Sequence, residues 1–236
     1  MANDQIEPER KPIKLFLLIV FAVFLIFRCF YLFFSDPERF PIDVVKVESP
    51  FKFVDRKTIE KTISPFLEKS FFTLPVHQLH QQLNALNGIE QVDVKRLWPD
   101  QLVLHFEERH PIASWHNQLI TPSGEVFSTK DPAIFDNLPK LEGPEKNKKD
   151  ILHTYQKLSK ILSGYGFYCR ELSYSPAQGW QLRLKNDMLI ELGNQQIISR
   201  LERFLRRLPA IQAESSARIN YADLRYKQGV AVKYEQ

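Results

Sequence analysis

The sequence predicts an α+β chain in which one apolar helix near the N-terminus precedes a small α+β domain and an antiparallel β-rich domain with two helices. Three patterns support this prediction. Residues 15–34 form a single apolar run. Residues 42–109 follow the order strand, helix, helix, strand, strand, and residues 110–236 hold several short segments in which apolar and polar residues alternate. With 236 residues, 44% of them hydrophobic, the chain is large enough to build the cores that such domains need.

The apolar run Leu15–Phe34 predicts a transmembrane helix. At a rise of about 1.5 Å per residue it reaches roughly 30 Å, which is the thickness of the hydrocarbon core of a bilayer. Arg28 lies near enough to its end to extend toward the headgroups. A cleaved signal peptide is the alternative, and it is disfavoured because bulky residues and then Ser35-Asp36-Pro37 follow in place of a small-residue cleavage site.

Charges on the two sides of this run predict its orientation. Arg10, Lys11 and Lys14 precede it, whereas the other side opens with Asp36, Glu38 and Arg39. By the positive-inside rule the N-terminal arm is cytoplasmic and the rest of the chain is exported, so we expect a single-pass membrane protein whose domains lie outside the cytoplasm. The expected parts are a cytoplasmic arm (1–14), the span (15–34), a linker (35–41), a first domain (42–109) and a second domain (110–236).

In the first domain, strand and helix patterns follow one another closely. β-branched residues indicate a strand at Ile42–Glu48. Asp55 is placed to cap the next helix, whose last turn Pro65 disturbs. A proline-containing turn, Trp98–Gln101, joins two alternating segments into a hairpin. The expected elements after the first strand are helices at 56–64 and 76–86, the second closed by Gly88, and strands at 92–97 and 102–107.

In the second domain, strands and helices are expected on both sides of a loop region that runs to about Lys149. Pro209 is expected to end the second helix. The last run of the chain, Arg218–Tyr234, reads as two strands separated by the break Tyr226–Gly229. The second domain opens with the segments 108–115, 119–121 and 125–127, the last two separated by a turn at 122–124. The other expected elements are a helix at 150–162, antiparallel strands at 171–174, 180–184 and 188–192, and a helix at 195–208.

Two features of the second domain allow a binding role and a purely structural one. Basic residues on the outward face of the second helix could meet lipid headgroups or an acidic partner, but they also complement the helix dipole, which is the favoured interpretation. They are Arg200, Arg203, Arg206 and Arg207. A strand that ends the chain is often an edge strand, whose unpaired backbone groups are either shielded or recruit an extended segment of a partner.

Motifs of catalysis and cofactor binding are missing from the sequence. We find no nucleophile elbow, phosphate-binding loop or dinucleotide-binding motif. His77 and His80 lack the glutamate of a zinc-protease helix, and the neighbours Glu107 and Glu108 should point to opposite faces of a strand. We therefore expect no enzyme, no catalytic residue, no metal, no cofactor and no small-molecule substrate. The part of the chain after the apolar run has 28 basic and 25 acidic residues, a net charge of about +3. This mildly basic balance is far from the dense basic patch that nucleic-acid binding needs.

The two cysteines do not predict a disulfide. Cys29 lies in the membrane run and Cys169 lies far into the exported part, so they cannot pair within one chain. Cys169 is expected to be a buried apolar side chain.

Four segments carry a resemblance to a known family. The chain resembles the FtsQ/DivIB family of bacterial cell-division proteins over almost all of its exported part. The segments are Val92–Leu102 with its Trp98-Pro99-Asp100 turn, Glu108–Trp115, Gly124–Phe127 and Tyr221–Tyr226. The resemblance implies a POTRA domain followed by a β domain, both in the periplasm and anchored in the inner membrane. It also implies a non-enzymatic scaffold of the divisome at the division septum that links early and late division proteins.

The resemblance also implies partners and contact residues. In that family the POTRA domain engages upstream components such as FtsK, and the terminal β strands bind FtsB in a complex with FtsL. Tyr234 stands where a tryptophan can occur in the family, and Gln228 where a serine can. The residues that correspond to the contact region are Arg225, Tyr226, Gln228, Gly229 and Tyr234. The structural alternative is that Tyr226 and Tyr234 only cover an edge strand.

Two other functions compete with the divisome scaffold. A POTRA-bearing component of polypeptide transport or secretion would receive unfolded chains, but such proteins usually carry a membrane barrel, and no string of lipid-facing alternating strands follows here. An anchored periplasmic hydrolase would act on peptidoglycan or peptides, and the missing motifs argue against it.

Overall fold

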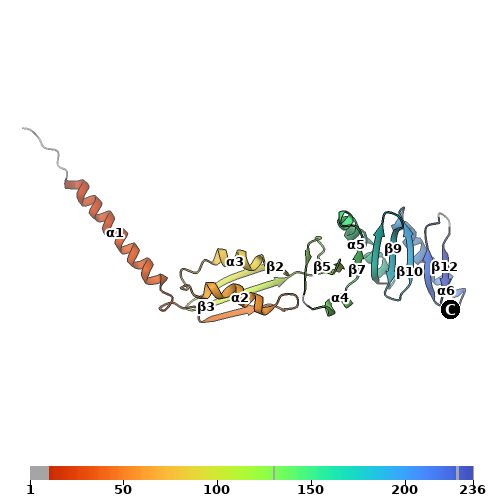
Figure 1. Cartoon of the computed structure of the whole chain (residues 1–236), viewed down its shortest axis with the longest axis horizontal. Coiled ribbons are helices and arrows are strands. Elements are labelled where there is room, and N and C mark those ends of the chain that lie inside the picture. Colours follow the sequence, from red (N-terminus) through yellow and green to blue (C-terminus); the bar gives the residue numbers. More distant parts are fainter. Residues whose placement is uncertain (1–10, 130, 227–228, 236) are drawn as a thin grey trace, which may run out of the picture. The chain divides into compact units, whose positions relative to one another are not determined.

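The computed structural model describes residues 11–129, 131–226 and 229–235 (Figure 1). The chain divides after Glu108 into two compact units, which are described separately below. Helix α1 (Lys11–Ser35) begins the first unit. Its segment Leu15–Ser35 is long and apolar enough to cross a membrane, and none of its apolar window is buried against the protein. The predicted apolar helix is therefore confirmed, and it begins four residues before the apolar run.

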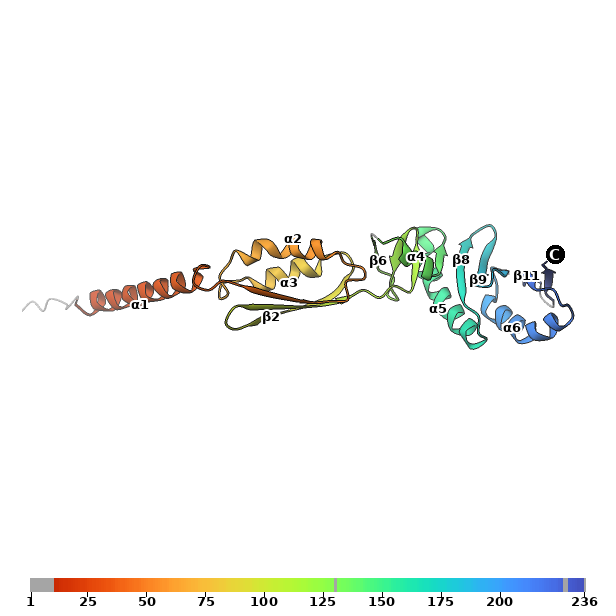
Figure 2. The ribbon, with the colours of Figure 1, turned by 90° about the horizontal axis from the view of Figure 1, so that it is seen from below.

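The rest of the first unit has the predicted order β-α-α-β-β. Strand β1 is parallel to the central strand β3, and β2 is antiparallel to β3, so the order across the sheet is β1-β3-β2. Helices α2 and α3 cover one face of this sheet (Figure 2). The elements are β1 (Val44–Glu48), α2 (Arg56–Leu67), α3 (Val76–Asn84), β2 (Ile89–Leu97) and β3 (Gln101–Glu108).

Buried and more exposed residues alternate along β3, and the buried ones define the sheet face that the helices cover. Leu102, Leu104 and Phe106 are buried against the two helices, whereas their neighbours Val103 and His105 lie on the open face. Asp55 caps α2 as predicted, because its carboxylate accepts a hydrogen bond from the Lys57 N–H. Pro65 lies inside α2, which runs on to Leu67.

The second unit contains a nine-stranded sheet in the order β12-β11-β10-β9-β8-β7-β4-β5-β6. The prediction of antiparallel strands is correct for β8, β9 and β10. The pairs β4–β7, β7–β8 and β10–β11, for which the sequence predicted no pairing, are parallel, because longer connections return the chain to the sheet in the same direction. The strands are β4 (Ala113–Trp115), β5 (Gln118–Ile120), β6 (Val126–Phe127), β7 (Lys140–Glu142), β8 (Cys169–Ser175), β9 (Gly179–Leu184), β10 (Leu189–Gly193), β11 (Ile219–Asp223) and β12 (Ala231–Tyr234).

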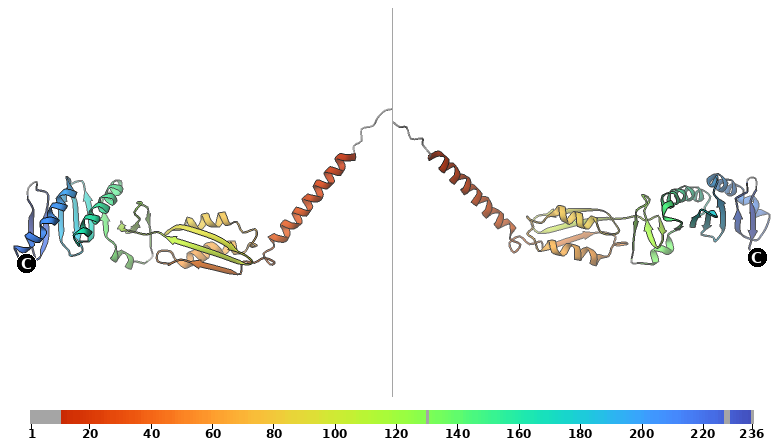
Figure 3. Two further views of the ribbon diagram at one scale, coloured as in Figure 1. Left: turned by 180° about the vertical axis from the view of Figure 1, so that it is seen from behind. Right: turned by 45° about the horizontal axis from the view of Figure 1, so that its top comes forward.

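Two long helices, α5 (Lys148–Gly164) and α6 (Ile197–Ala213), pack on this sheet and contact each other (Figures 2 and 3). Both were predicted, but Pro209 does not end the second one: α6 continues through Pro209 to Ala213. The region predicted as a loop contains β7, a short helix α4 (Ala133–Asn137) and a single 3₁₀ turn, η1 (Glu145–Asn147).

Cys169 lies in the core of the second unit, as expected from the sequence. Both cysteines are free, and burial raises the pKa of the Cys169 thiol to about 12. At neutral pH this thiol is therefore protonated and behaves as an apolar side chain.

Candidate protein-binding site at the last strand

Strand β12 is the edge of the nine-stranded sheet, and it pairs only with β11 among the strands described here. The register pairs Asp223 with Ala231 and Ile219 with Tyr234. Beyond the strand, the Glu235 N–H donates to the Arg218 carbonyl at 2.7 Å. In an antiparallel ladder alternate residues direct their N–H and C=O groups away from the partner strand, so the outer side of β12 can accept a further strand.

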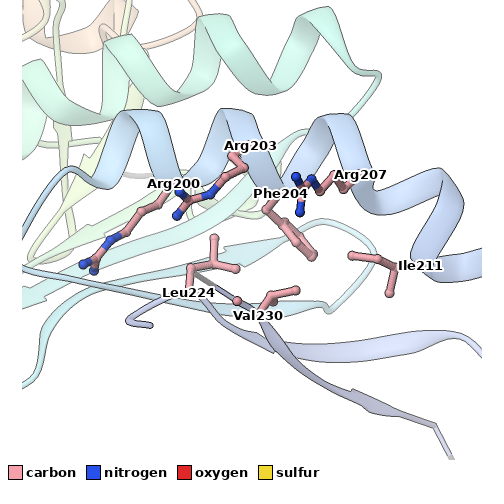
Figure 4. A pocket seen from close by; sticks show the side chains of 8 residues that line it. Arg200, Arg203, Phe204, Arg207, Ile211, Leu224 and Val230 are labelled. Atoms are coloured by element: carbon pink, nitrogen blue, oxygen red, sulfur yellow. The ribbon is translucent and has the colours of Figure 1, made fainter. Parts of the chain in front are cut away.

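A pocket lies beside this edge, between α6 and the segment that joins β11 to β12 (Figure 4). It encloses about 50 Å³. Helix α6 contributes three arginines at positions i, i+3 and i+7, which lie on one face of a helix. The lining residues are Arg200, Arg203, Phe204, Arg207 and Ile211 from α6, and Leu224, Gly229 and Val230 from the opposite segment.

The pocket combines positive charge with an apolar floor. Arg200 donates from Nη1 to the Leu192 carbonyl at 3.2 Å, which fixes its guanidinium against the end of β10. Arg203 and Arg207 make no ion pair with a carboxylate in the described part of the chain. Phe204 is buried below them. A ligand that carries a carboxylate next to an apolar group would satisfy both halves of the pocket.

Arg225, a residue predicted to contact a partner, is held by Asp223 at the end of β11. The Arg225 guanidinium donates to the Asp223 carboxylate from Nε at 2.9 Å and from Nη2 at 2.7 Å, and the Arg225 N–H adds a third bond at 3.0 Å. These bonds lower the pKa of Asp223, which is buried, and the same pair raises the pKa of Arg225. The guanidinium is fixed in direction but remains half exposed.

The stem of Arg225 also explains why Gly193 precedes α6. A side chain at Gly193 would lie 3.1 Å from the Arg225 Cγ, and the backbone there has a φ of +70°. Glycine adopts this conformation without the penalty that other residues have. The close approach lets the arginine stem lie over the end of β10.

Of the four other predicted contact residues, the structure describes three, and each has a different environment. Tyr226 is 58% exposed and follows Arg225 directly. Gly229 lines the pocket. Tyr234 packs against the core, and its hydroxyl donates to the Ile211 carbonyl at 3.3 Å, so this ring connects β12 to α6. Gln228 lies outside the described residues.

The arginines of α6 are visible in the sequence, where the interaction with the helix dipole is the favoured interpretation. Their spacing along the helix is the sequence signal that places them on one face. The other wall, Leu224 and Val230, carried no signal, because it is contributed by residues that are brought to α6 only when β11 and β12 pair. Within the described residues, no group of three or more metal-binding side chains lies close enough together to hold an ion.

The fold and the site define a class of protein: a membrane-anchored chain with a small β-α-α-β-β domain and a β domain that presents a free strand edge. Comparison with known families agrees with this class. The family model "POTRA domain, FtsQ-type" matches residues 40–109, and the model "Cell division protein FtsQ/DivIB, C-terminal" matches residues 113–225.

Individual relatives cover most of the chain. The cell division protein FtsQ of Escherichia coli (strain K12) is 31% identical over 205 residues, which are 84% of this chain and 74% of the relative. FtsQ of Alcanivorax borkumensis is 30% identical over 201 residues, with coverages of 84% and 78%. FtsQ of Allochromatium vinosum is 30% identical over 200 residues, with coverages of 84% and 80%. The chain belongs to the FtsQ family of cell-division proteins.

Proposed function

We propose that this protein is a non-enzymatic scaffold of the divisome that binds FtsB and FtsL through the edge of β12. In this proposal α1 anchors it in the inner membrane, with the N-terminus in the cytoplasm and both domains in the periplasm at the septum. The POTRA domain contacts upstream components such as FtsK. The boundaries that we propose are 1–14 for the arm, 15–34 for the span, 35–41 for the linker, 42–109 for the POTRA domain and 110–236 for the β domain.

The observation that carries the proposal is the free edge of β12 beside a pocket with three arginines. A partner segment that pairs with β12 gains backbone hydrogen bonds, which are independent of sequence. A carboxylate of that segment that reaches Arg203 or Arg207 then sets the register. Tyr226 supplies an exposed aromatic contact of the kind that often dominates binding energy.

Charge reversal in the pocket tests this proposal. The full chain in detergent is titrated with a purified FtsB–FtsL complex. Arg203→Glu should weaken binding about tenfold or more, because it places a carboxylate opposite the acidic residue of the partner. Arg206→Glu is the matched control: it makes the same charge change on the same helix, but Arg206 does not line the pocket.

A second pair of variants tests the aromatic contact. Tyr226→Ala should weaken binding by a similar factor, whereas Tyr168→Ala should not. Tyr168 is also a highly exposed tyrosine of the second unit but lies outside the edge strands. Equal affinities for wild type, Arg203→Glu and Tyr226→Ala would contradict the proposed interface.

The cellular role is tested by depletion. Loss of a divisome scaffold should give filaments with segregated chromosomes, and the Arg203→Glu chain should fail to restore division while the Arg206→Glu chain restores it. The names of the relatives favour this role over polypeptide transport. Normal cell length after depletion would contradict it.

A further inference from the structure

The turn between β2 and β3 carries an unusually exposed pair of apolar side chains. Trp98 is 77% exposed, more than any large apolar side chain in residues 15–35 of α1, and its neighbour Leu97 is 49% exposed. The two other tryptophans, Trp115 and Trp180, are 2% and 9% exposed. An exposed tryptophan at the tip of a hairpin marks a surface that is covered in the working protein.

This tip lies at the end of the domain where the chain arrives from α1 (Figure 2). The Asp43 N–H donates to the Asp100 carbonyl at 3.1 Å, and Val44, the first residue of β1, pairs with Gln101. Leu97 pairs with the same Gln101 on the other side. Leu97 and the half-exposed Val44 therefore flank Gln101 on the open face of the sheet.

The same end of the domain contacts the end of the apolar helix. The ring of Phe34 lies 5.5 Å from that of Phe40 and 4.9 Å from that of Phe72. The Ser70 hydroxyl donates to the Phe34 carbonyl. Arg96, which precedes Leu97, donates from Nη1 to the carbonyls of Phe71 and Phe72 at 3.0 and 3.2 Å. The hairpin tip and the phenylalanine cluster thus adjoin the same segment, residues 70–72.

The position of Phe34 along α1 sets the depth of these contacts relative to the bilayer. If α1 crosses the bilayer, its apolar segment ends at Ser35, so Phe34 lies at the boundary between the hydrocarbon core and the headgroups. Side chains that contact Phe34 lie in the same interfacial layer. Tryptophan is the residue that this layer favours most clearly, because its ring is apolar and its indole N–H can bond to headgroups or water.

We propose that Leu97 and Trp98 insert into the headgroup layer of the leaflet from which the POTRA domain emerges. The ligand is the phospholipid interface itself. Charge does not carry this contact, because the tip itself, residues 97–100, contains one acidic residue, Asp100, and no basic one. The domain then has two attachments to the bilayer, the span and the hairpin tip, and two attachments restrict its tilt in a way that one cannot.

The inference goes beyond the proposed function and shares only the membrane anchor with it. The full chain is reconstituted into phosphatidylcholine vesicles, and tryptophan emission is recorded for wild type and for Trp98→Phe. The difference isolates Trp98, since Trp115 and Trp180 are present in both. We expect the Trp98 emission to be blue-shifted, to lose most of its intensity with brominated acyl chains, and to be protected from acrylamide in water. Added phosphatidylglycerol or high salt should leave these readings unchanged.

Two results would overturn the proposal. If acrylamide quenches Trp98 in vesicles while brominated lipid does not, the tip is in water. If Trp98 is protected from both quenchers, a second copy of the chain covers it instead. Trp98→Gln should retain the affinity for FtsB–FtsL, so a failure here is distinguishable from a failure of the proposed β12 interface.

Discussion

A buried carboxylate, Glu108, holds the loop that precedes α2. It ends β3 and is 3% exposed, and its oxygens accept hydrogen bonds from the N–H groups of Lys52, Phe53 and Val54 at 2.9 to 3.4 Å. Its neighbour Glu107 is exposed on the opposite face, as the alternation predicted. The two carboxylates therefore do not face each other, and the hydrogen bonds of Glu108 give it a structural role.

Glu108→Gln tests this role. The amide nitrogen of glutamine cannot accept these bonds, and hydrogen bonds to a charged group are the stronger kind, so the free energy of unfolding should fall by roughly 1.5–3 kcal/mol. Glu107→Gln, the control, should change it by less than about 0.5 kcal/mol. Denaturant unfolding of the full chain in detergent measures both, and equal effects would contradict the assignment.

The Asp223–Arg225 pair predicts a dependence of stability on pH. The arginine lowers the pKa of Asp223 below its unfolded value, so the contribution of the pair is fully present above the ordinary pKa of aspartate, about 4, and is lost as the pH falls through the folded pKa. The unfolding free energy of wild type should therefore fall more steeply below about pH 4 than that of Asp223→Asn. Parallel curves for the two proteins would show that the carboxylate is not perturbed.

At the scale of elements, tertiary packing keeps α6 helical beyond Pro209, although proline usually ends a helix. Pro209 lacks the N–H that an internal helix position donates, and the sequence therefore predicted an end at this point. Beyond it, Ile211 contacts the core, and its carbonyl accepts the hydrogen bond of Tyr234. These contacts keep the last turn helical, and they depend on β12, which is distant in sequence.

Pro209→Ala should stabilise the second unit. An internal proline destabilises a helix by about 3 kcal/mol relative to alanine. Proline also restricts the unfolded chain, which stabilises the folded state by up to about 1 kcal/mol. Replacing Pro209 by alanine should therefore raise the free energy of unfolding by about 2 kcal/mol. The thermal midpoint of the second unit measures this gain. No increase would mean that the surrounding contacts already compensate the missing hydrogen bond.

Strand β7 and the pocket could not be predicted from the sequence. The long strands and helices have repeated apolar positions, so their type was predictable, and β2, β3 and α5 differ from expectation only at their ends. β7 has three residues, of which only Leu141 is fully buried. Secondary structure is predicted from the spacing between apolar residues, and one buried residue defines no spacing. It became a strand through its neighbours β4 and β8. The contact residues of the candidate site were predictable from the family resemblance. The pocket between α6 and the β11–β12 segment was not predictable from the sequence.

At the scale of the whole molecule, each unit has its own core. Leu104 is fully buried in the first core and Leu182 in the second. Leu104→Ala should lower the unfolding free energy of the first unit by about 2–5 kcal/mol and leave the second unchanged, and Leu182→Ala should do the reverse. Calorimetry of the full chain in detergent should resolve two transitions that respond separately. One transition that shifts with either substitution would show that the units unfold together.

The pairing of β1 with β3 has a consequence for the order of folding. Val44 is among the first residues of the POTRA domain to follow the span, and its partner Gln101 is among the last to be made. Hydrogen bonds between such distant residues form only after the intervening chain is available, and they require a large loop to close. Strand β1 therefore stays unpaired until the β2–β3 hairpin has formed. The docking of this hairpin against β1 is then the step that completes the three-stranded sheet.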